Sequence, residues 1–238
     1  MSERRAPAQA AFVLHTYPYR ETSLLVETFT RSVGRVSLMA RGARRPRSAT
    51  RGTLMAFQPL MLAWFGKGEL KTLAHVEWTG GQALLQGEAL LCGFYLNELL
   101  VKLLAREDPH EQLFERYREA VRALSAGEPS APILRAFEKA LLQELGYAMV
   151  LEREAASGRA IDPGALYTYD PERGPVALEG RWAELQLSGS TLLDLARDDL
   201  SDPRTLAQAK ALMKALIAHR LEYQPLNSRR IFKELLEL

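Results

Sequence analysis

The sequence predicts an α+β protein in which a small closed β-barrel at the N-terminus is followed by a mainly α-helical domain. The hydrophobic period is two over the first 80 residues and close to 3.6 after Gly80-Gly81. Five short strands in about 80 residues suit a small barrel, which leaves no exposed sheet edge. At 238 residues and 47% hydrophobic content, the chain can form two hydrophobic cores. We expect domains at 1–80 and 81–238.

The first domain is expected to contain five strands, two pairs of which are joined by short connections containing glycine, as in β-hairpins. The expected strands are Ala11–Tyr17, Thr22–Phe29, Arg35–Arg41, Leu60–Phe65 and Glu69–Trp78. In the third strand, one face carries Val36, Leu38 and Ala40, and the other carries Arg35, Ser37, Met39 and Arg41. In the fifth strand, one face is expected to carry Leu70, Thr72, Ala74, Val76 and Trp78.

The second domain is expected to be helical, with a turn-rich insert at about 150–185 that holds one small hairpin. The expected helices are 83–105, 110–125, 130–146, 190–196, 203–220 and 227–236. The first of them is apolar almost all round, which is typical of a helix buried at the centre of a domain. Asp202 and Pro203 predict the N-cap and first position of the helix at 203–220.

Positive charge is concentrated in the first domain. Residues 1–80 carry 12 Lys+Arg against 5 Asp+Glu, the remaining residues carry 19 against 24, and no acidic residue lies between Glu27 and Glu69. This asymmetry indicates a polyanionic partner, because phosphate backbones attract several positive charges together. The predicted nucleic-acid contacts are Arg31, Arg35, Arg41, Arg44, Arg45, Arg47, Arg51, Lys67 and Lys71. The alternative is a solvated basic loop that aids solubility.

Two further groups of residues are candidates for binding. Tyr17 and Tyr19, on either side of Pro18, are the best candidates for stacking on bases, although core packing is the general alternative for aromatic side chains. Arg135, Phe137 and Lys139, near the start of the third helix, are candidates for a groove that binds an acidic peptide tail. An ordinary amphipathic helix is the alternative reading of this second group.

Sequence signatures of catalysis are absent. The chain has no P-loop, GxGxxG, GxSxG or HExxH pattern, and its single cysteine, Cys92, excludes an intramolecular disulfide and a zinc site of paired cysteines. We expect no enzymatic activity, no cofactor and no bound metal. The longest apolar stretch, Leu54–Phe65, is too short to cross a bilayer, and no signal peptide is visible, so a soluble cytoplasmic protein is expected. An RNA- or ribosome-binding barrel would show the same basic face, and a nuclease would need metal-binding carboxylates near it.

Five segments together resemble the bacterial RecO family of DNA recombination and repair proteins. They are AFVLHTYPYRETSLLVETFTRSVGRVSLMARGARRPR (11–47), FQPLMLAWFGKGELKTL (57–73), FYLNELLVKLL (94–104), LRAFEKALLQELGY (134–147) and NSRRIFKELL (227–236). The resemblance implies an N-terminal OB-fold and a helical domain with a zinc-finger-like insert. It also implies binding of single- and double-stranded DNA, strand annealing, and RecA loading onto DNA coated by single-strand binding protein (SSB). RecR and the acidic C-terminal tail of SSB are the implied partners, with Arg135 and Lys139 as contacts of the tail, in the cytoplasm at the nucleoid.

The chain departs from the family pattern in one respect. Many RecO proteins bind zinc through two CxxC pairs in the insert, and here the first pair would fall near Glu154 and Ser157. No cysteine follows Cys92, so the chain resembles the zinc-free branch of the family. We expect the insert to keep its shape without zinc.

Overall fold

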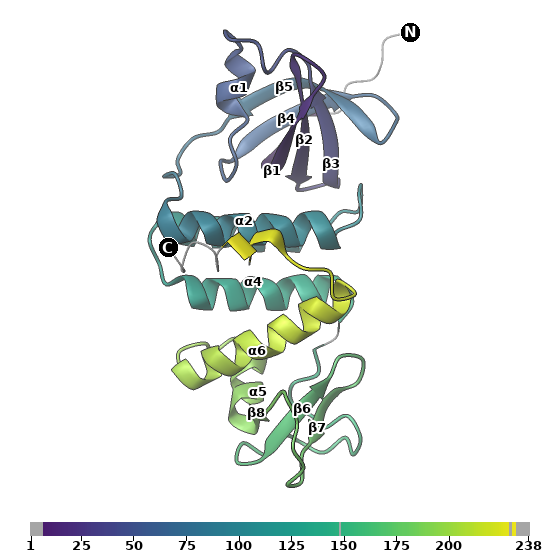
Figure 1. The fold of residues 1–238 in the computed structure, drawn as a ribbon, viewed down its shortest axis with the longest axis vertical. Coiled ribbons are helices and arrows are strands. Elements are labelled where there is room, and N and C mark those ends of the chain that lie inside the picture. The colour runs from purple at the N-terminus through teal and green to yellow at the C-terminus, as the bar shows by residue number, and fades with distance from the viewer. Residues whose placement is uncertain (1–6, 148, 229, 232–238) are drawn as a thin grey trace. The chain divides into compact units, whose positions relative to one another are not determined.

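The computed structural model describes residues 7–147, 149–228 and 230–231 (Figure 1), and these form two compact units. The first unit comprises the described parts of Met1–Glu128 and Leu226–Leu238, and the second comprises those of Pro129–Pro225. The expected fold class is confirmed, since a closed five-stranded barrel is followed by a mainly helical region. The first unit continues beyond the barrel into two helices, so the domain boundary at residue 80 stays a prediction.

The barrel has the strand order β1-β2-β3-β5-β4 and closes through pairing of β4 with β1. Its strands are β1 (Gln9–Tyr19), β2 (Ser23–Thr30), β3 (Gly34–Ala40), β4 (Leu60–Phe65) and β5 (Leu70–Trp78). Neighbouring strands are antiparallel except β3 and β5, which are parallel. Val36, Leu38 and Ala40 lie in the buried core, which confirms the two faces expected for β3.

The expected alternation along β5 is wrong in its first half. Ala63 pairs with His75 and Trp64 pairs with Leu73, so Ala74 is an extra residue in a β-bulge. Since a one-residue shift moves side chains to the opposite face, Leu73 packs against the barrel core in place of Leu70. The bulge cannot be recognised from a strand sequence that alternates throughout.

Two helices of the first unit, α2 (Gly87–Leu103) and α3 (Glu111–Ser125), cover part of the outer surface of the barrel. Phe12 lies 5.6 Å from Phe114 and 5.1 Å from Tyr117, measured between ring centroids, and all three side chains are buried. The Asn97 Nδ2 donates to the Leu14 carbonyl at 2.8 Å, and the Tyr117 hydroxyl donates to the Asn97 Oδ1 at 2.5 Å. This buried network joins α2, α3 and β1. A short helix not expected from the sequence, α1 (Ala49–Thr53), lies in the basic segment after β3.

The second unit combines three helices with a three-stranded sheet of order β7-β6-β8. Its elements are α4 (Ser130–Glu144), β6 (Leu166–Asp170), β7 (Gly174–Ala177), β8 (Leu187–Ser188), α5 (Gly189–Ala196) and α6 (Pro203–Arg220). The hairpin expected in the insert is formed by β6 and β7. The Asp202 side chain accepts from the backbone N–H of Arg204 at 2.9 Å, which confirms the predicted N-cap of α6.

The last expected helix, 227–236, lies mostly outside the described residues, although Asn227, Ser228, Arg230 and Ile231 are helical. Within the part of the chain that the structure describes, no helix has the length and apolar character of a membrane-spanning segment.

Candidate nucleic-acid interface

The outer face of the barrel carries aromatic and apolar side chains near the β1–β2 turn. Tyr17 pairs with Leu25, and Leu25 pairs with Met39, so these three side chains share one face. Their neighbours Val26 and Leu38 point into the core, which places this row on the outside. Tyr17 is 42% exposed, and Leu25 and Met39 are half-buried. Tyr17 therefore presents an exposed aromatic ring beside the apolar side chains of Leu25 and Met39.

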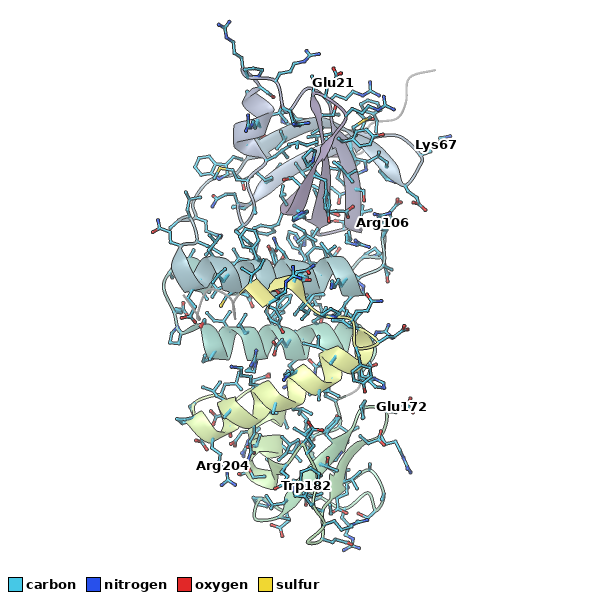
Figure 2. All side chains as sticks on the ribbon, viewed as in Figure 1. Glu21, Lys67, Arg106, Glu172, Trp182 and Arg204 are labelled. Atoms are coloured by element: carbon cyan, nitrogen blue, oxygen red, sulfur yellow. The ribbon has the colours of Figure 1, made fainter. Side chains whose placement is uncertain are left out.

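Two arginines meet at the β1–β2 turn, Arg20 from the turn itself and Arg44 from the segment after β3. Arg20 has a left-handed backbone (φ 51°), and its guanidinium carbon lies 5.4 Å from the centre of the Tyr19 ring. Arg44 holds the turn in place, because its backbone N–H donates to the Thr22 carbonyl at 2.9 Å and its Nη1 donates to the Arg20 carbonyl at 3.0 Å. A hollow of about 510 Å³ opens here, lined by Arg20, Glu21, Thr22, Ser23, Met39 and Arg41. Glu21 marks the tip of the turn in Figure 2.

The remaining arginines near this end of the barrel lie in the segment that follows β3. Arg41, Arg44, Arg45, Arg47 and Arg51 are all exposed. Within the described residues, none of them forms an ion pair. With Arg20 they make six arginines on the β1–β2 turn and the segment after β3, where Glu21 is the single acidic residue. We call this the open end of the barrel.

Three of the predicted contacts are already paired with carboxylates. Arg31 and Arg35 lie at the opposite end of the barrel, and Lys71 pairs with Leu38, midway along β3. Arg31 lies 3.5 Å from Glu115, and Lys71 lies 2.6 Å from Glu107. Arg35 lies 3.5 Å from Glu27, and its pKa is lowered because burial disfavours its charge, although Glu27 partly opposes this effect. Lys67 is exposed on the β4–β5 turn and projects outward in Figure 2. We call this the closed end of the barrel.

The closed end is built by the connection between α2 and α3. The backbone N–H of Glu107 donates to the Arg35 carbonyl at 2.9 Å, and Arg106 forms a parallel bridge with Arg35. Gly34 (φ 78°) permits this approach, since a Cβ atom there would lie 1.9 Å from the Asp108 carbonyl oxygen. Arg106, labelled in Figure 2, also contacts the buried carboxylate of Glu27 at 3.2 Å. Arg106 and Glu27 are 79 residues apart in the sequence, so this contact could not be predicted from local sequence patterns.

The three residues expected to bind an acidic tail do not form an open groove. Phe137 is 2% exposed, and Arg135 and Lys139 are each 7% exposed. The Arg135 Nη2 lies 2.7 Å from Glu138, and the Lys139 Nζ donates to the Leu195 carbonyl at 2.5 Å and to Asp198 at 2.6 Å. Lys139 does line a cavity of about 350 Å³, together with Gln143, Met149, Val150, Leu151, Glu152, Arg153 and Ala196. The site for an acidic peptide tail stays a prediction. If Lys139 contacts such a tail, it would do so at this cavity.

The insert contains Glu154 and Ser157, the two positions where the resemblance would place the first pair of zinc ligands. Ser157 donates a hydrogen bond to the Glu154 carboxylate, and the backbone N–H of Glu154 donates to the Arg159 carbonyl at 2.8 Å. A carboxylate and a hydroxyl do not resemble the thiolate and imidazole ligands of structural zinc sites. No group of three or more His, Cys, Asp or Glu able to hold a metal occurs among the described residues. The residues present therefore do not fit zinc, and hydrogen bonds close the turn.

Comparisons with known proteins agree with this architecture. Residues 5–82 match the family model described as "Recombination protein O N terminal", and residues 84–230 match "Recombination protein O C terminal". The chain is 57% identical over 237 residues to the DNA repair protein RecO of Aromatoleum aromaticum, covering 99% of each chain. It is 56% identical over 239 residues to RecO of Dechloromonas aromatica, covering 98% of each, and 52% identical over 240 residues to RecO of Nitrosospira multiformis, covering 100% and 99%. The chain therefore belongs to the recombination protein O (RecO) family.

Proposed function

We propose that this chain is a cytoplasmic, nucleoid-associated DNA repair and recombination protein that binds DNA through the open end of its barrel without catalysis. The observation that carries the proposal is the charge of this end, where six arginines face a single carboxylate. Phosphate contacts by several cations release counterions and supply most of the affinity of non-specific DNA binding. Arg supplies a forked donor set for phosphate.

The geometry favours particular roles for the residues at the open end. Arg41, Arg45 and Arg47 contact phosphates, because they are exposed and form no ion pair within the described chain. Tyr17 is the stacking platform, since the ring of Tyr19 is already covered by Arg20. Arg44 acts mainly by holding the β1–β2 turn in place.

Membership of the RecO family supports a wider activity as part of this proposal. Neutralising the phosphates of one bound strand lets a complementary strand approach, which promotes annealing. The second unit recruits the protein to SSB-coated DNA by binding the acidic SSB tail, with RecR as the partner that supports RecA loading. At the cavity beside Lys139, a carboxylate of the tail replaces that of Asp198, which is 68% exposed.

The first test is fluorescence anisotropy with a labelled single-stranded oligonucleotide across a salt series. We expect the Arg41→Ala/Arg45→Ala/Arg47→Ala variant to bind more weakly, with a log-affinity against log-salt slope flatter by about 2, because each lost phosphate contact removes roughly 0.7. The matched control is Arg173→Ala/Arg181→Ala/Arg204→Ala, which removes the same charge from exposed positions of the second unit. Equal curves for both variants would show that the open end is a solvated surface.

Two further measurements with the same labelled oligonucleotide address the other classes of protein. A structured RNA that displaces the single-stranded DNA at a lower concentration than DNA itself would favour an RNA- or ribosome-binding barrel. Cleavage of the labelled oligonucleotide during incubation with magnesium would contradict the non-catalytic part of the proposal.

A further inference from the structure

The closed end of the barrel owes its charge state to one acidic segment, Glu107–Glu115, which contains Glu107, Asp108, Glu111 and Glu115. Three of its carboxylates pair with barrel cations, since Glu107 lies 2.6 Å from Lys71, and Glu111 and Glu115 lie 3.9 and 3.5 Å from Arg31. Together with Glu27 and Glu69 they make six acidic residues. The basic residues there also number six, namely Arg31, Arg35, Lys67, Lys71, Arg106 and Arg118, the last of which lies 2.5 Å from Glu115. The barrel is therefore strongly basic at one end and nearly neutral at the other.

The two ends are far enough apart to act separately on a bound nucleic acid. Arg41 follows the last residue of β3 and Arg35 lies near its start, six residues away, which corresponds to about 20 Å at roughly 3.3 Å per residue. That separation is about twice the Debye length at 0.1 M salt. The charge of the closed end is thus felt by phosphates that lie over it, and only weakly by those at the open end.

We infer that the acidic segment confines nucleic acid to the open end and thereby makes the barrel favour single strands over duplex. This inference rests on the proposed function. A single strand has one row of phosphates, which can remain over the open end. A duplex has two rows, separated by grooves about 6 and 12 Å wide, so its second row extends toward the closed end. There Arg31, Arg35 and Lys71 already have carboxylate partners and offer the second row little attraction.

The test compares two variants that remove equal charge from the first unit. Glu111→Gln/Glu115→Gln releases Arg31 of the barrel together with Arg118 of α3. The control Glu119→Gln/Glu128→Gln releases Arg116 of α3 and removes carboxylates that contact no barrel residue in the described structure. We expect the first variant to bind duplex roughly threefold more tightly for each arginine it releases, with a salt slope steeper by about 0.9. Its affinity for single strands should change less, so the ratio of duplex to single-strand affinity rises. The control should leave this ratio unchanged.

An equal change of the ratio in both variants, or no change in either, would overturn the inference. Arg31→Ala supplies a second measurement that does not depend on the glutamine variants folding well. It should leave single-strand affinity within about twofold of the parent, whereas loss of a true phosphate contact makes binding measurably weaker and flattens the salt slope by roughly 0.7. If the open-end triple variant binds single strands as well as the parent does, the proposed function fails. If that variant binds weakly but the ratio does not move, only this inference fails.

Discussion

The carboxylate of Glu98 in α2 fixes the point at which the chain returns to the first unit. It accepts the backbone N–H groups of Asn227 and Ser228, each at 2.8 Å, and the Ser228 hydroxyl at 2.7 Å. Lys102 lies 3.2 Å away. Burial raises the pKa of Glu98, but the hydrogen bonds from Ser228, Asn227 and Lys102 outweigh it and hold the pKa below its ordinary value of 4.5.

We expect Glu98→Gln to lower the free energy of unfolding of the first unit by about 2 kcal/mol near pH 7, because hydrogen bonds to a charged group contribute roughly 1.5–3 kcal/mol. For a unit of this size the melting temperature should fall by about 4–8 °C. The folded-state pKa is lowered, so this stabilisation is complete above the unfolded pKa and is lost as the pH falls through the folded value. The difference between parent and variant should therefore be constant from about pH 7 to 6 and shrink below about pH 4.

Urea unfolding followed by tryptophan fluorescence and circular dichroism measures this difference at each pH. Glu119→Gln is the control, since Glu119 pairs only with the exposed Arg116 within the described chain. A double-mutant cycle of Glu98→Gln with Ser228→Ala should give a coupling energy of about 1 kcal/mol. Additive effects, or a parent–variant difference that persists unchanged at pH 3, would refute the role assigned to Glu98.

Two further predictions concern the first unit. Gly34→Ala should prevent the closed end from forming, because its Cβ would lie 1.9 Å from the Asp108 carbonyl oxygen. The control is Gly80→Ala, which has a similar positive φ of 85° but open space around it. It should lower the free energy of unfolding by only about 1 kcal/mol in thermal melts. Asn97→Ala should lower the free energy of unfolding by about 2–4 kcal/mol, since it removes a buried side chain together with both of its hydrogen bonds. Tyr117→Phe removes one of these bonds and should cost about 1 kcal/mol, so equal losses would contradict the network.

Most of the fold could be predicted because local signals coincide with the ends of elements. β4 was expected at Leu60–Phe65 and α6 at Pro203–Arg220, and both have these bounds in the structure. Gly66 ends the first, and the Asp202 cap begins the second. The bulge at Ala74 and the short helix α1 were missed. A bulge leaves no trace in an alternating sequence, and five residues are too few to show a helical period.

From the sequence, the candidate site could be predicted only as an excess of positive charge in the first 80 residues. Counting charges does not reveal which basic side chains are already paired with carboxylates. The ion pairs of the closed end join residues that are distant in sequence. Lys71 and Glu107 are 36 residues apart, and Glu27 and Arg106 are 79 residues apart. Arg106 and Glu107 follow Gly80-Gly81 and are counted with the acidic part of the sequence, although they belong to the same compact unit as the barrel. The excess of positive charge that predicts a polyanionic partner is therefore a property of one end of the barrel. For this reason Arg41 and Arg45, rather than Arg31 and Lys71, are the substitutions that test DNA binding.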